Sequence, residues 1–438
     1  MNTPINKDIV NDEIKKSGLN DLGKATIREI VGLVNKIQDA SQSKYVRMEM
    51  GSPSLTPPEI GINGEIEALK KGVASDYPMV DGVKELKDEA SKFIKNFMGI
   101  DISPTSCIPT VGSMQGGYAT FLLCSNLDPK KDTALFIDPG FPVQKQQFGV
   151  LGYKYETFDV YNYRGEALRD KLESFLSKGN INSIIYSNPN NPSWICLTEE
   201  ELKIIGDIAN KYDAIVIEDL AYFAMDFRRD LYHPGKPPYQ VSVANYTDNY
   251  VMLISGSKAF SYAGQRIAVV AISDKIFNRS YPNLIKRFGS EKFGYTFVLR
   301  IIYALSSGVS HSAQYGMAAM LKAANEGKFN FVEEVKEYGK RAHVMKKMFT
   351  DAGFKIVYDK DLDEDIADGF YFTISYPGFS GGELVKELLY YGISAISLDD
   401  TGSLRKEGLR ACVSQVRPEL FPILQERLDA FKKDHANA

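Results

Sequence analysis

Polar and charged side chains follow several of the predicted strands, at the point where each strand ends. Ser187 to Ser193 (SNPNNPS) comes after one apolar run, Asp219 to Tyr222 (DLAY) after a second, and Ser255 to Lys258 (SGSK) after a third, with Arg266 a few residues later. The carboxyl ends of parallel strands meet at one edge of a sheet, where α/β proteins bind their ligands. We therefore expect these residues to form one site.

A binding site for an anion is predicted at Gly112, Ser113 and Met114. These residues begin a predicted helix that runs through GGYATFLLCSNL to the Asp128-Pro129 stop. The first turn of a helix has free N–H groups and the positive end of the helix dipole, and both favour a bound anion.

The segments between these residues alternate between strand-like and helix-like patterns, which is typical of α/β architecture with a mostly parallel sheet. The predicted strands are short runs without polar alternation, as expected where helices cover both faces. Between two of them, Thr198 and Glu201 form a capping box that opens a helix with one apolar face. The predicted strands are 133–138, 183–187, 214–219, 251–255 and 267–272.

The pattern changes after about residue 310. Long helical stretches lead to a strand-like DGFYFTISY, a helix, a second strand near GLRACVSQ and a final helix. We therefore predict a large domain at 51–310 and a smaller α+β domain at 311–438. We expect residues 1–50 to pack on the small domain, with the part after about residue 20 closing over a substrate and influencing specificity.

Composition excludes several classes of protein. The 438 residues are 44% hydrophobic and 25% charged, with a formal net charge of −4, as in ordinary globular proteins. No apolar run approaches the ~18 residues of a membrane-spanning helix, so we expect no membrane partner. Charges of both signs are interspersed, so we expect no nucleic-acid partner. The first residues lack the layout of a signal peptide, which favours an intracellular, cytoplasmic protein.

Cysteine and histidine usage argues against a metal site. The chain has four histidines and no H-E-x-x-H motif, and its four cysteines are scattered without a C-x-x-C pair. We interpret the cysteines as buried thiols rather than as a disulfide framework or a zinc site. They are Cys107, Cys124, Cys196 and Cys412.

The ordered set of these segments resembles the fold-type I, pyridoxal-phosphate-dependent aminotransferases of class I/II. The resemblance extends from MGSP near residue 50 to LRACVSQ near residue 410. One piece, such as SGSK, occurs in many loops, but the ordered ensemble is specific. The resemblance implies a large cofactor-binding domain with a smaller α+β domain, and pyridoxal 5'-phosphate as the cofactor.

The resemblance assigns the catalytic roles. Lys258 matches the lysine that holds the cofactor as a Schiff base and moves a proton between Cα and C4′; a solvated surface lysine is the alternative. Asp219 matches the aspartate that keeps the ring nitrogen protonated, and its neighbour Glu218 should point away. Tyr222 and Asn191 match the residues that hydrogen-bond the phenolic oxygen.

The resemblance also implies how the rest of the cofactor is bound. Phe141 matches the aromatic residue that stacks on the ring, although a core phenylalanine is the competing interpretation. Tyr77 matches the tyrosine that reaches across a homodimer interface to the partner's phosphate, and a turn tyrosine before Pro78 is the alternative. The phosphate itself would be held by six residues, namely Gly112, Ser113, Met114, Ser255, Ser257 and Arg266.

Substrate recognition is assigned to Arg410, which matches the arginine that grips the α-carboxylate; an exposed strand-end arginine is the alternative. Gly51 matches the glycine whose backbone passes close to the substrate, and Asn191 is expected beside it. Arg300 could bind a distal carboxylate, although a surface arginine on a helix is the simpler interpretation.

Two positions depart from the family pattern. The usual Asn-Pro-Thr-Gly is here Asn191-Pro192-Ser193-Trp194, which places the chain's single tryptophan where the family has glycine. Met114 stands where the family often has a hydroxyl or amide residue. The first departure is expected to affect the shape of the pocket, and the second removes one side-chain contact to the phosphate.

The predicted function is that of an aminotransferase that passes nitrogen from an amino acid to a 2-oxo acid. A PLP-dependent β-lyase or decarboxylase remains open, because the same residues serve those reactions and differ only in which bond is aligned with the cofactor ring. A DNA-binding regulator is disfavoured, since the segment before residue 50 is too short and not basic enough for an added domain. A nicotinamide-binding protein is disfavoured because no G-x-G-x-x-G follows a strand.

Overall fold

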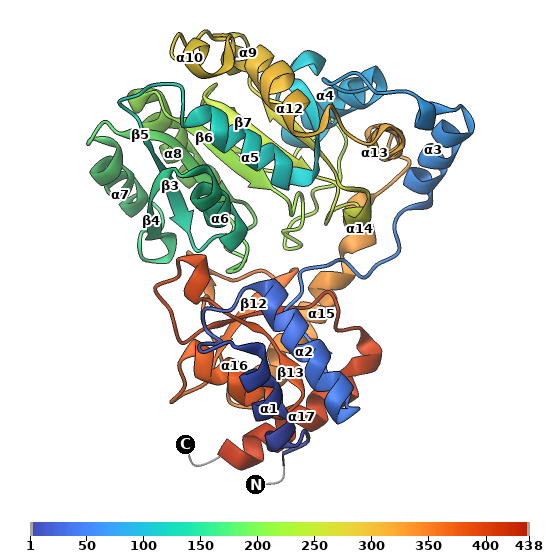
Figure 1. The fold of residues 1–438 in the computed structure, drawn as a ribbon, viewed down its shortest axis with the longest axis vertical. Helices are drawn as coiled ribbons and strands as arrows, with labels where there is room; N and C mark the ends of the chain where they lie inside the picture. The colour runs from blue at the N-terminus through green and yellow to red at the C-terminus, as the bar shows by residue number, and fades with distance from the viewer. Residues whose placement is uncertain (1–2, 436–438) are drawn as a thin grey trace.

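The computed structural model describes residues 3–435 and has two parts, which lie above and below a waist in Figure 1. The upper part is built on a seven-stranded sheet and the lower part on a four-stranded antiparallel sheet. The predicted fold class, an α/β domain with a smaller α+β domain, is confirmed.

The large sheet has the strand order β2-β8-β7-β6-β5-β3-β4, and only β8 runs antiparallel to its neighbours. Its strands are β2 (Cys107–Val111), β3 (Thr133–Asp138), β4 (Lys154–Asp159), β5 (Ile181–Ser187), β6 (Ile215–Leu220), β7 (Tyr250–Ser255) and β8 (Ile267–Ile272). The five predicted strands are present, with ends that differ by at most two residues.

The two strands that no apolar run indicated, β2 and β4, are the edges of this sheet. Strand β2 contains Pro109, which edge strands tolerate because one side of the backbone has no partner strand. Strand β4 (KYETFD) is polar and largely exposed for its first four residues. An edge strand buries less surface, so its sequence carries a weaker signal.

Helices cover both faces of the sheet and form two separate apolar cores. On one face lie α5 (Gly112–Cys124) and α6 (Pro142–Leu151), and on the other lie α7 (Ala167–Leu176) and α8 (Glu199–Tyr212). The capping box of Thr198 and Glu201 is present at the start of α8. The remaining helical elements of this part are α3 (Glu59–Lys70), η1 (Val73–Ser75), α4 (Lys84–Met98), η2 (Pro104–Ser106), η3 (Val160–Asn162), η4 (Val243–Asn245), η5 (Ala263–Gln265), α9 (Asp274–Asn278), α10 (Leu284–Phe288), α11 (Phe293–Thr296), the π-helix η6 (Phe297–Ile302), α12 (Tyr303–Ser306) and α13 (His311–Asn325).

The small domain is built on the sheet β14-β15-β12-β9 and a separate hairpin, β10-β11. Its strands are β9 (Lys355–Ile356), β10 (Lys360–Asp361), β11 (Glu364–Asp365), β12 (Tyr371–Ser375), β13 (Ile393–Ser394), β14 (Ile396–Ser397) and β15 (Leu409–Cys412). Its helices are α14 (Phe331–Val335), α15 (Glu337–Asp351), α16 (Gly381–Tyr390), η7 (Asp399–Thr401), η8 (Pro418–Leu420) and α17 (Phe421–His435).

The predicted domain boundary near residue 310 stays a prediction, and the packing of helix α13 bears on it. Helix α13 packs against α3 and α4 of the large domain, whereas α15 packs against β12 and α17 of the small one. The contact of α13 with α3 is close: a Cβ on Gly64 would lie 2.8 Å from the Cβ of Ala319. The sequence pattern of α13 gives no sign of which domain its apolar face covers. We propose a boundary near residue 330.

The N-terminal segment contains α1 (Lys7–Ser17), α2 (Ile27–Ser41) and β1 (Val46–Arg47). Strand β1 pairs in parallel with β13, and the hydroxyl of Tyr45 donates to the carbonyl oxygen of Leu389 over 2.6 Å. In Figure 1 these elements lie beside α16 in the lower part of the molecule. Closure of this segment over a substrate stays a prediction.

Among residues 3–435, no helix is both long enough and apolar enough to cross a membrane.

Candidate active site

Lys258 lies just after β7 and is partly buried. Its Nζ donates to the carbonyl oxygen of Gly51 and lies 5.3 Å from the centre of the Phe370 ring. Burial, together with the nearby guanidiniums of Arg410 and Arg266, lowers the pKa of Lys258 to about 8. About a tenth of the amine is therefore uncharged at pH 7, far more than for an ordinary lysine, and only the uncharged amine can act as a nucleophile or base.

Asp219 lies near the end of β6 and is buried. Its carboxylate accepts hydrogen bonds from Gln144 Nε2 (2.9 Å) and from the backbone N–H of Ala221 (3.1 Å). Both donors are neutral, and burial raises the pKa of Asp219 to about 6. A buried carboxylate with neutral donors can stabilise a cation placed against it. The neighbouring Glu218 points to the other face, where it accepts from Ser242 and Tyr186.

Tyr222 and Asn191 are both buried and both contact residues from the small domain. The hydroxyl of Tyr222 donates to the hydroxyl of Tyr371 over 2.9 Å, and burial is the main reason that the pKa of Tyr222 is raised well above its ordinary value. The side-chain oxygen of Asn191 accepts from Arg410 Nη1 over 3.3 Å. These contacts bring side chains of the two domains into one site.

Arg410, on β15, is 2% exposed and pairs with no carboxylate in the part of the chain that the structure describes. Its Nη2 donates to the backbone oxygen of Glu49 (2.7 Å), and its guanidinium lies 4.6 Å from the ring centre of Tyr371. Its Nε has no hydrogen-bond partner among residues 3–435. An unsatisfied donor on a buried cation is costly, and an α-carboxylate would satisfy it.

Gly51 is placed where a larger residue would not fit. A Cβ at this position would lie 2.2 Å from the hydroxyl oxygen of Tyr371. Its carbonyl accepts from Lys258, and Arg410 binds the backbone two residues earlier. The backbone of residues 49–51 therefore connects the two cationic side chains of the site.

The predicted anion site is built around the start of α5. Gly112 has φ +66° and lies against Arg266, because a Cβ there would be 2.5 Å from Arg266 Nη2. The N–H of Gly112 donates to the backbone oxygen of Arg266 (3.0 Å), so this N–H is already used, contrary to the prediction. Among residues 3–435 no side chain caps the start of α5, so the N–H groups of Ser113 and Met114 can take an anion at this end of the helix.

The two predicted serines lie beside this turn. Ser255 is buried at the end of β7, and its hydroxyl accepts from the N–H of Ser257 over 3.1 Å. Arg266 is exposed, and its Nη1 donates to the carbonyl oxygen of Ala263. The carbonyl of Met114 accepts from Gln147, while its side chain offers no polar group. Phe141 is partly buried immediately before α6.

Two of the predicted site residues, Tyr77 and Arg300, are exposed and lie outside the site in a single chain. Tyr77 is 90% exposed and lines a surface groove with residues 306–312. Arg300 is exposed on the π-helix η6, with its guanidinium 5.5 Å from the ring centre of Tyr295. The predicted role of Tyr77 requires a second copy of the chain.

Trp194, which stands where the family has glycine, is accommodated by the backbone of its loop and by space in the small domain. It has φ +65°, the region that glycine prefers, and its side chain is fully buried. A Cβ on Gly369 would lie 1.9 Å from the indole, so the small domain leaves room for this ring. The ring is packed edge-on against Tyr222, with 5.3 Å between the ring centres. Trp194 therefore lies behind Tyr222.

Sequence reasoning missed Gln144, Phe370 and Tyr371. Gln144 lies one turn into α6 and reaches Asp219 across a sequence separation of 75 residues. Tyr371 is one of 25 tyrosines, and nothing in its immediate neighbours distinguishes it. The one usable signal is the position of Phe370 and Tyr371 at the start of a strand, after the glycine of DGFYF.

Comparison with known proteins decides the family. The family model "Aminotransferase class I and II" matches residues 44–415, which is most of the chain. The chain belongs to this aminotransferase family. Its members use pyridoxal phosphate, and the predicted function as an aminotransferase is confirmed at this level.

Similar proteins agree with this assignment. A probable aspartate aminotransferase from Methanocaldococcus jannaschii is 24% identical over 69% of this chain and 74% of its own length. The (5-formylfuran-3-yl)methyl phosphate transaminase from the same organism is 24% identical over 83% of this chain and 84% of its own length. Among solved structures, the alanine aminotransferase from Pyrococcus furiosus has a TM-score of 0.74 at 19% identity, covering 97% of this chain and 99% of that one.

The residues present in this aminotransferase fit the cofactor. A buried Asp219 with neutral donors suits a protonated ring nitrogen, and Lys258 with its lowered pKa suits a covalent link to an aldehyde. The start of α5, with its Ser113 and Met114 N–H groups near the exposed Arg266 guanidinium, suits a phosphate.

Proposed function

We propose that this aminotransferase moves the amino group of an α-amino acid to a 2-oxo acid, with Lys258 as the reactive lysine and Arg410 as the carboxylate anchor. The observation that carries the proposal is the backbone of residues 49–51, to which Lys258 and Arg410 both donate. This segment contacts both an amine of lowered pKa and an incompletely satisfied guanidinium, as a substrate with an α-amino and an α-carboxylate group requires.

Each residue then has a role at a stated atom. The uncharged Nζ of Lys258 accepts the proton from the substrate Cα and later returns a proton, as a base and then an acid. The guanidinium of Arg410 binds the α-carboxylate through Nε and Nη groups and so fixes the orientation of Cα. The ionised carboxylate of Asp219 stabilises the positive charge on the ring nitrogen, and Gln144 holds that carboxylate. The bound cofactor supplies the electron sink for the carbanion at Cα.

Burial of the side chains at the junction of the two domains keeps water away from this chemistry. Tyr222, Asn191 and Arg410 are all nearly inaccessible to solvent, and their mutual contacts join the two domains. In a site with little water, the attraction between Arg410 and a carboxylate is stronger than at the surface.

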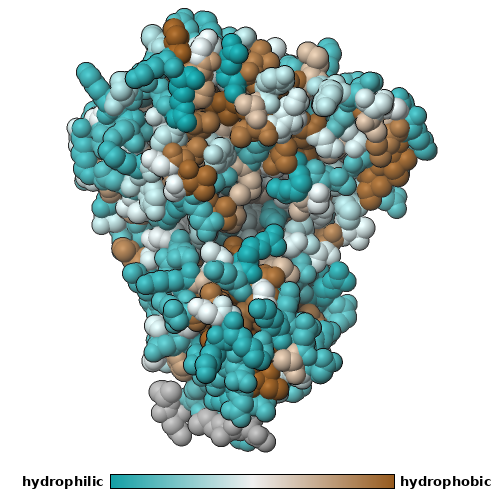
Figure 2. All heavy atoms as spheres, viewed as in Figure 1, coloured by the Kyte–Doolittle hydropathy of each residue, from teal (hydrophilic) through white to brown (hydrophobic). Residues whose placement is uncertain are grey.

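We also propose that the enzyme is a homodimer with shared active sites. Large hydrophobic side chains gather over α3 at the right edge of the molecule in Figure 2, and others lie on the adjoining loop and on η6 and α12. Apolar groups exposed in this number on one side are typical of a protein interface. A second copy would cover them and bring Tyr77 to its phosphate site. The residues are Ile66, Leu69, Tyr77, Met79, Leu299, Tyr303 and Leu305.

The test is the visible absorption spectrum of the purified enzyme, with added pyridoxal phosphate, before and after amino acids are supplied without an oxo acid. The panel should include aspartate, alanine, diaminopimelate and aromatic amino acids, because the names of similar proteins include them. Conversion of the cofactor band to that of the pyridoxamine form by one amino acid would support the proposal and identify the donor.

Two other results would change the proposal. A band that persists while product accumulates would favour a β-lyase or decarboxylase acting with the same residues. A protein that takes up pyridoxal phosphate but responds to no amino acid in the panel, even at high concentration, would contradict the assignment of Arg410 as an α-carboxylate anchor.

A further inference from the structure

The loop that carries Asn191 is compact and holds its own shape. The N–H of Asn190 donates to the carbonyl of Ile195 over 2.9 Å, and the N–H of Trp194 returns a bond to the carbonyl of Asn190 over 3.0 Å. The side-chain oxygen of Asn190 accepts from the N–H and the hydroxyl of Ser193. Residues 190–195 should therefore move as one unit, and Asn191 with them.

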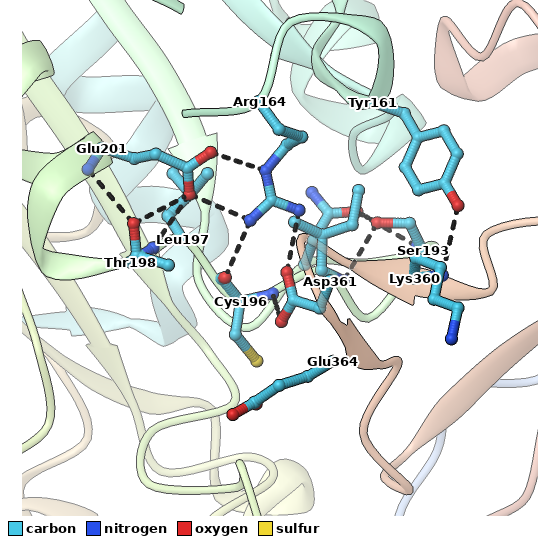
Figure 3. Close-up of polar contacts among 12 residues, drawn as sticks. Tyr161, Arg164, Ser193, Cys196, Leu197, Thr198, Glu201, Lys360, Asp361 and Glu364 are labelled. Carbon is cyan, nitrogen blue, oxygen red and sulfur yellow. Dashed lines mark hydrogen bonds and ion pairs between the residues drawn. The ribbon is translucent and has the colours of Figure 1, made fainter. Parts of the chain in front are cut away.

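This unit is fixed to the rest of the protein at Cys196, where the loop ends. The N–H of Cys196 donates to Asp361 Oδ2 over 3.2 Å, and its carbonyl oxygen accepts from Arg164 Nη2 over 3.2 Å. Both backbone groups of one residue are thus held by charged side chains. Figure 3 shows Arg164 above Cys196 and Asp361 beside it, each joined to the backbone of Cys196 by a dashed line.

Arg164 and Asp361 belong to a buried ion-pair network that crosses the domain junction. Arg164 pairs with Glu201 (2.6 Å) and with Asp361 (2.8 Å), and Arg228 pairs with Asp361 and with Asp226 (2.8 Å each). The side chains of Arg164 and Asp361 are 7% and 3% exposed. Burial alone would raise the pKa of Glu201, but the Arg164 guanidinium holds it below its ordinary value, so Glu201 is ionised at neutral pH.

Asp361 comes from a different domain than its partners. It lies on β10, in the hairpin β10-β11 of the small domain, whereas Arg164, Glu201 and Arg228 lie in the large domain. A second contact supports the same junction: the hydroxyl of Tyr161 donates to the carboxylate of Asp359 over 2.6 Å. The network therefore connects the small domain to Cys196, at the C-terminal end of the loop that carries Asn191.

The N-terminal end of the loop makes a separate contact with the small domain, because the side-chain oxygen of Asn191 accepts a hydrogen bond from Arg410. The loop is held to the small domain at both ends, by Arg410 at Asn191 and by Asp361 at Cys196. A shift of the loop relative to the small domain would separate Asn191 from Arg410.

We propose that Asp361 is a positioning residue, which fixes the loop 190–196 against the small domain and so sets the geometry of Asn191 and Arg410. The part that concerns substrate binding rests on the proposed function, whereas the part that concerns the loop does not. Nothing in the family motifs of the sequence indicated this residue.

The chain contains a reporter for this loop. Trp194 is the only tryptophan of the sequence, lies two residues before Cys196 and is fully buried. Indole emission moves to longer wavelength and becomes easier to quench when the ring meets water. Intrinsic fluorescence of the cofactor-free protein therefore reports on the position of the loop without any requirement for activity.

The variant to test is Asp361→Asn. An asparagine oxygen can still accept from the N–H of Cys196, while Arg164 keeps Glu201 and Arg228 keeps Asp226 as ion-pair partners, so no buried arginine is left unpaired. Asp361→Ala, which also removes the acceptor, should have a larger effect. The matched control is Asp363→Asn, because Asp363 is exposed in the turn of the same hairpin and makes no ion pair among residues 3–435.

We expect Asp361→Asn to shift the Trp194 emission to longer wavelength and to increase its quenching by acrylamide at temperatures well below unfolding. In the enzyme with cofactor, we expect KM for the amino acid to rise on the order of tenfold, since a misplaced anchor weakens substrate binding. The affinity for pyridoxal phosphate should change much less. Asp363→Asn should change none of these quantities.

Two results would overturn the proposal, and a third would separate it from the proposed function. If Asp361→Asn lowers the melting temperature but leaves the emission and KM unchanged, its role is purely structural. Equal effects of Asp361→Asn and Asp363→Asn would indicate a general charge effect of the hairpin. If the emission shifts as expected but the wild-type enzyme transaminates no amino acid, the positioning of the loop stands and the proposed function fails.

Discussion

The hydroxyl of Tyr222 lies 2.9 Å from the hydroxyl of Tyr371, and both groups are buried at the junction of the two domains. Tyr222 follows β6 of the large sheet, and Tyr371 begins β12 of the small one. The proposed contact of Tyr222 with the phenolic oxygen of the cofactor therefore depends on a residue from the other domain.

Replacing Tyr371 with phenylalanine should raise the pH at which the cofactor absorption band changes. Hydroxyl groups can reverse their donor roles, so Tyr371 can donate to Tyr222 when Tyr222 donates to the cofactor. Loss of a hydrogen bond worth about 1 kcal/mol should raise the pKa of the bound cofactor by about 0.7. A pH titration of the cofactor absorption band measures this change in pKa. An unchanged titration would show that Tyr371 does not act through Tyr222.

Lys258→Ala should abolish turnover and leave the fold intact, as judged by circular dichroism and the melting temperature. In the wild-type protein, the rate at which the cofactor-free enzyme takes up pyridoxal phosphate should rise as the pH passes through about 8. The lowered pKa of Lys258 means that the uncharged, nucleophilic amine dominates above that pH. Stopped-flow absorbance at pH 6 to 10 would measure the rate, with Lys258→Ala as the control. A rate independent of pH would contradict this assignment.

Arg410→Ala should raise KM for the amino acid by roughly 100-fold, since a charged, hydrogen-bonded contact to the carboxylate is lost. Arg410→Lys should recover only part of this loss, because an ammonium group cannot make the two parallel bonds of a guanidinium. Affinity for pyridoxal phosphate should change little. Steady-state kinetics and cofactor titration measure the two effects, and Lys406→Ala, an exposed position before β15, is the control. A collapse of cofactor affinity with unchanged KM would refute the assignment.

Glu218→Gln should stabilise the cofactor-free protein above pH 7. Burial raises the pKa of Glu218 to about 7 from an ordinary value of 4.5, and its partners are the hydroxyls of Ser242 and Tyr186. Because the folded state then holds the proton more tightly, the wild type loses stability as the pH rises from 4.5 to 7. The loss amounts to up to about 3 kcal/mol at pH 8.

Urea unfolding of wild type and Glu218→Gln at pH 5 and pH 8 tests this expectation. The difference in unfolding free energy between the two proteins should grow in favour of the variant at the higher pH. A difference that is the same at both pH values would mean that Glu218 is not kept protonated by its burial.

Much of the large domain could be predicted from the sequence because its central strands are buried on both faces. Strands such as β3 and β6 appear as unbroken apolar runs, and polar residues such as Asp219 stand out at their ends. The edge strands β2 and β4 lack that pattern because solvent covers part of them. The sequence grouped helix α13 with the small domain, whereas it packs against α3 and α4, since an amphipathic pattern shows that a face is buried but not which element covers it.

Some residues of the candidate site could likewise be predicted from the sequence, and others could not. Lys258, Asp219, Asn191 and Arg410 could be proposed from the sequence because each stands in a local pattern of neighbours. Gln144, Tyr371 and Asp361 could not, because their partners lie 75 to 165 residues away and only the packing of the two domains brings them together. The sequence by itself thus determined which chemistry the protein performs. The tertiary structure decided which side chains hold the reacting groups in place. Positioning depends on contacts between segments that share no local pattern, so it cannot be seen in the sequence.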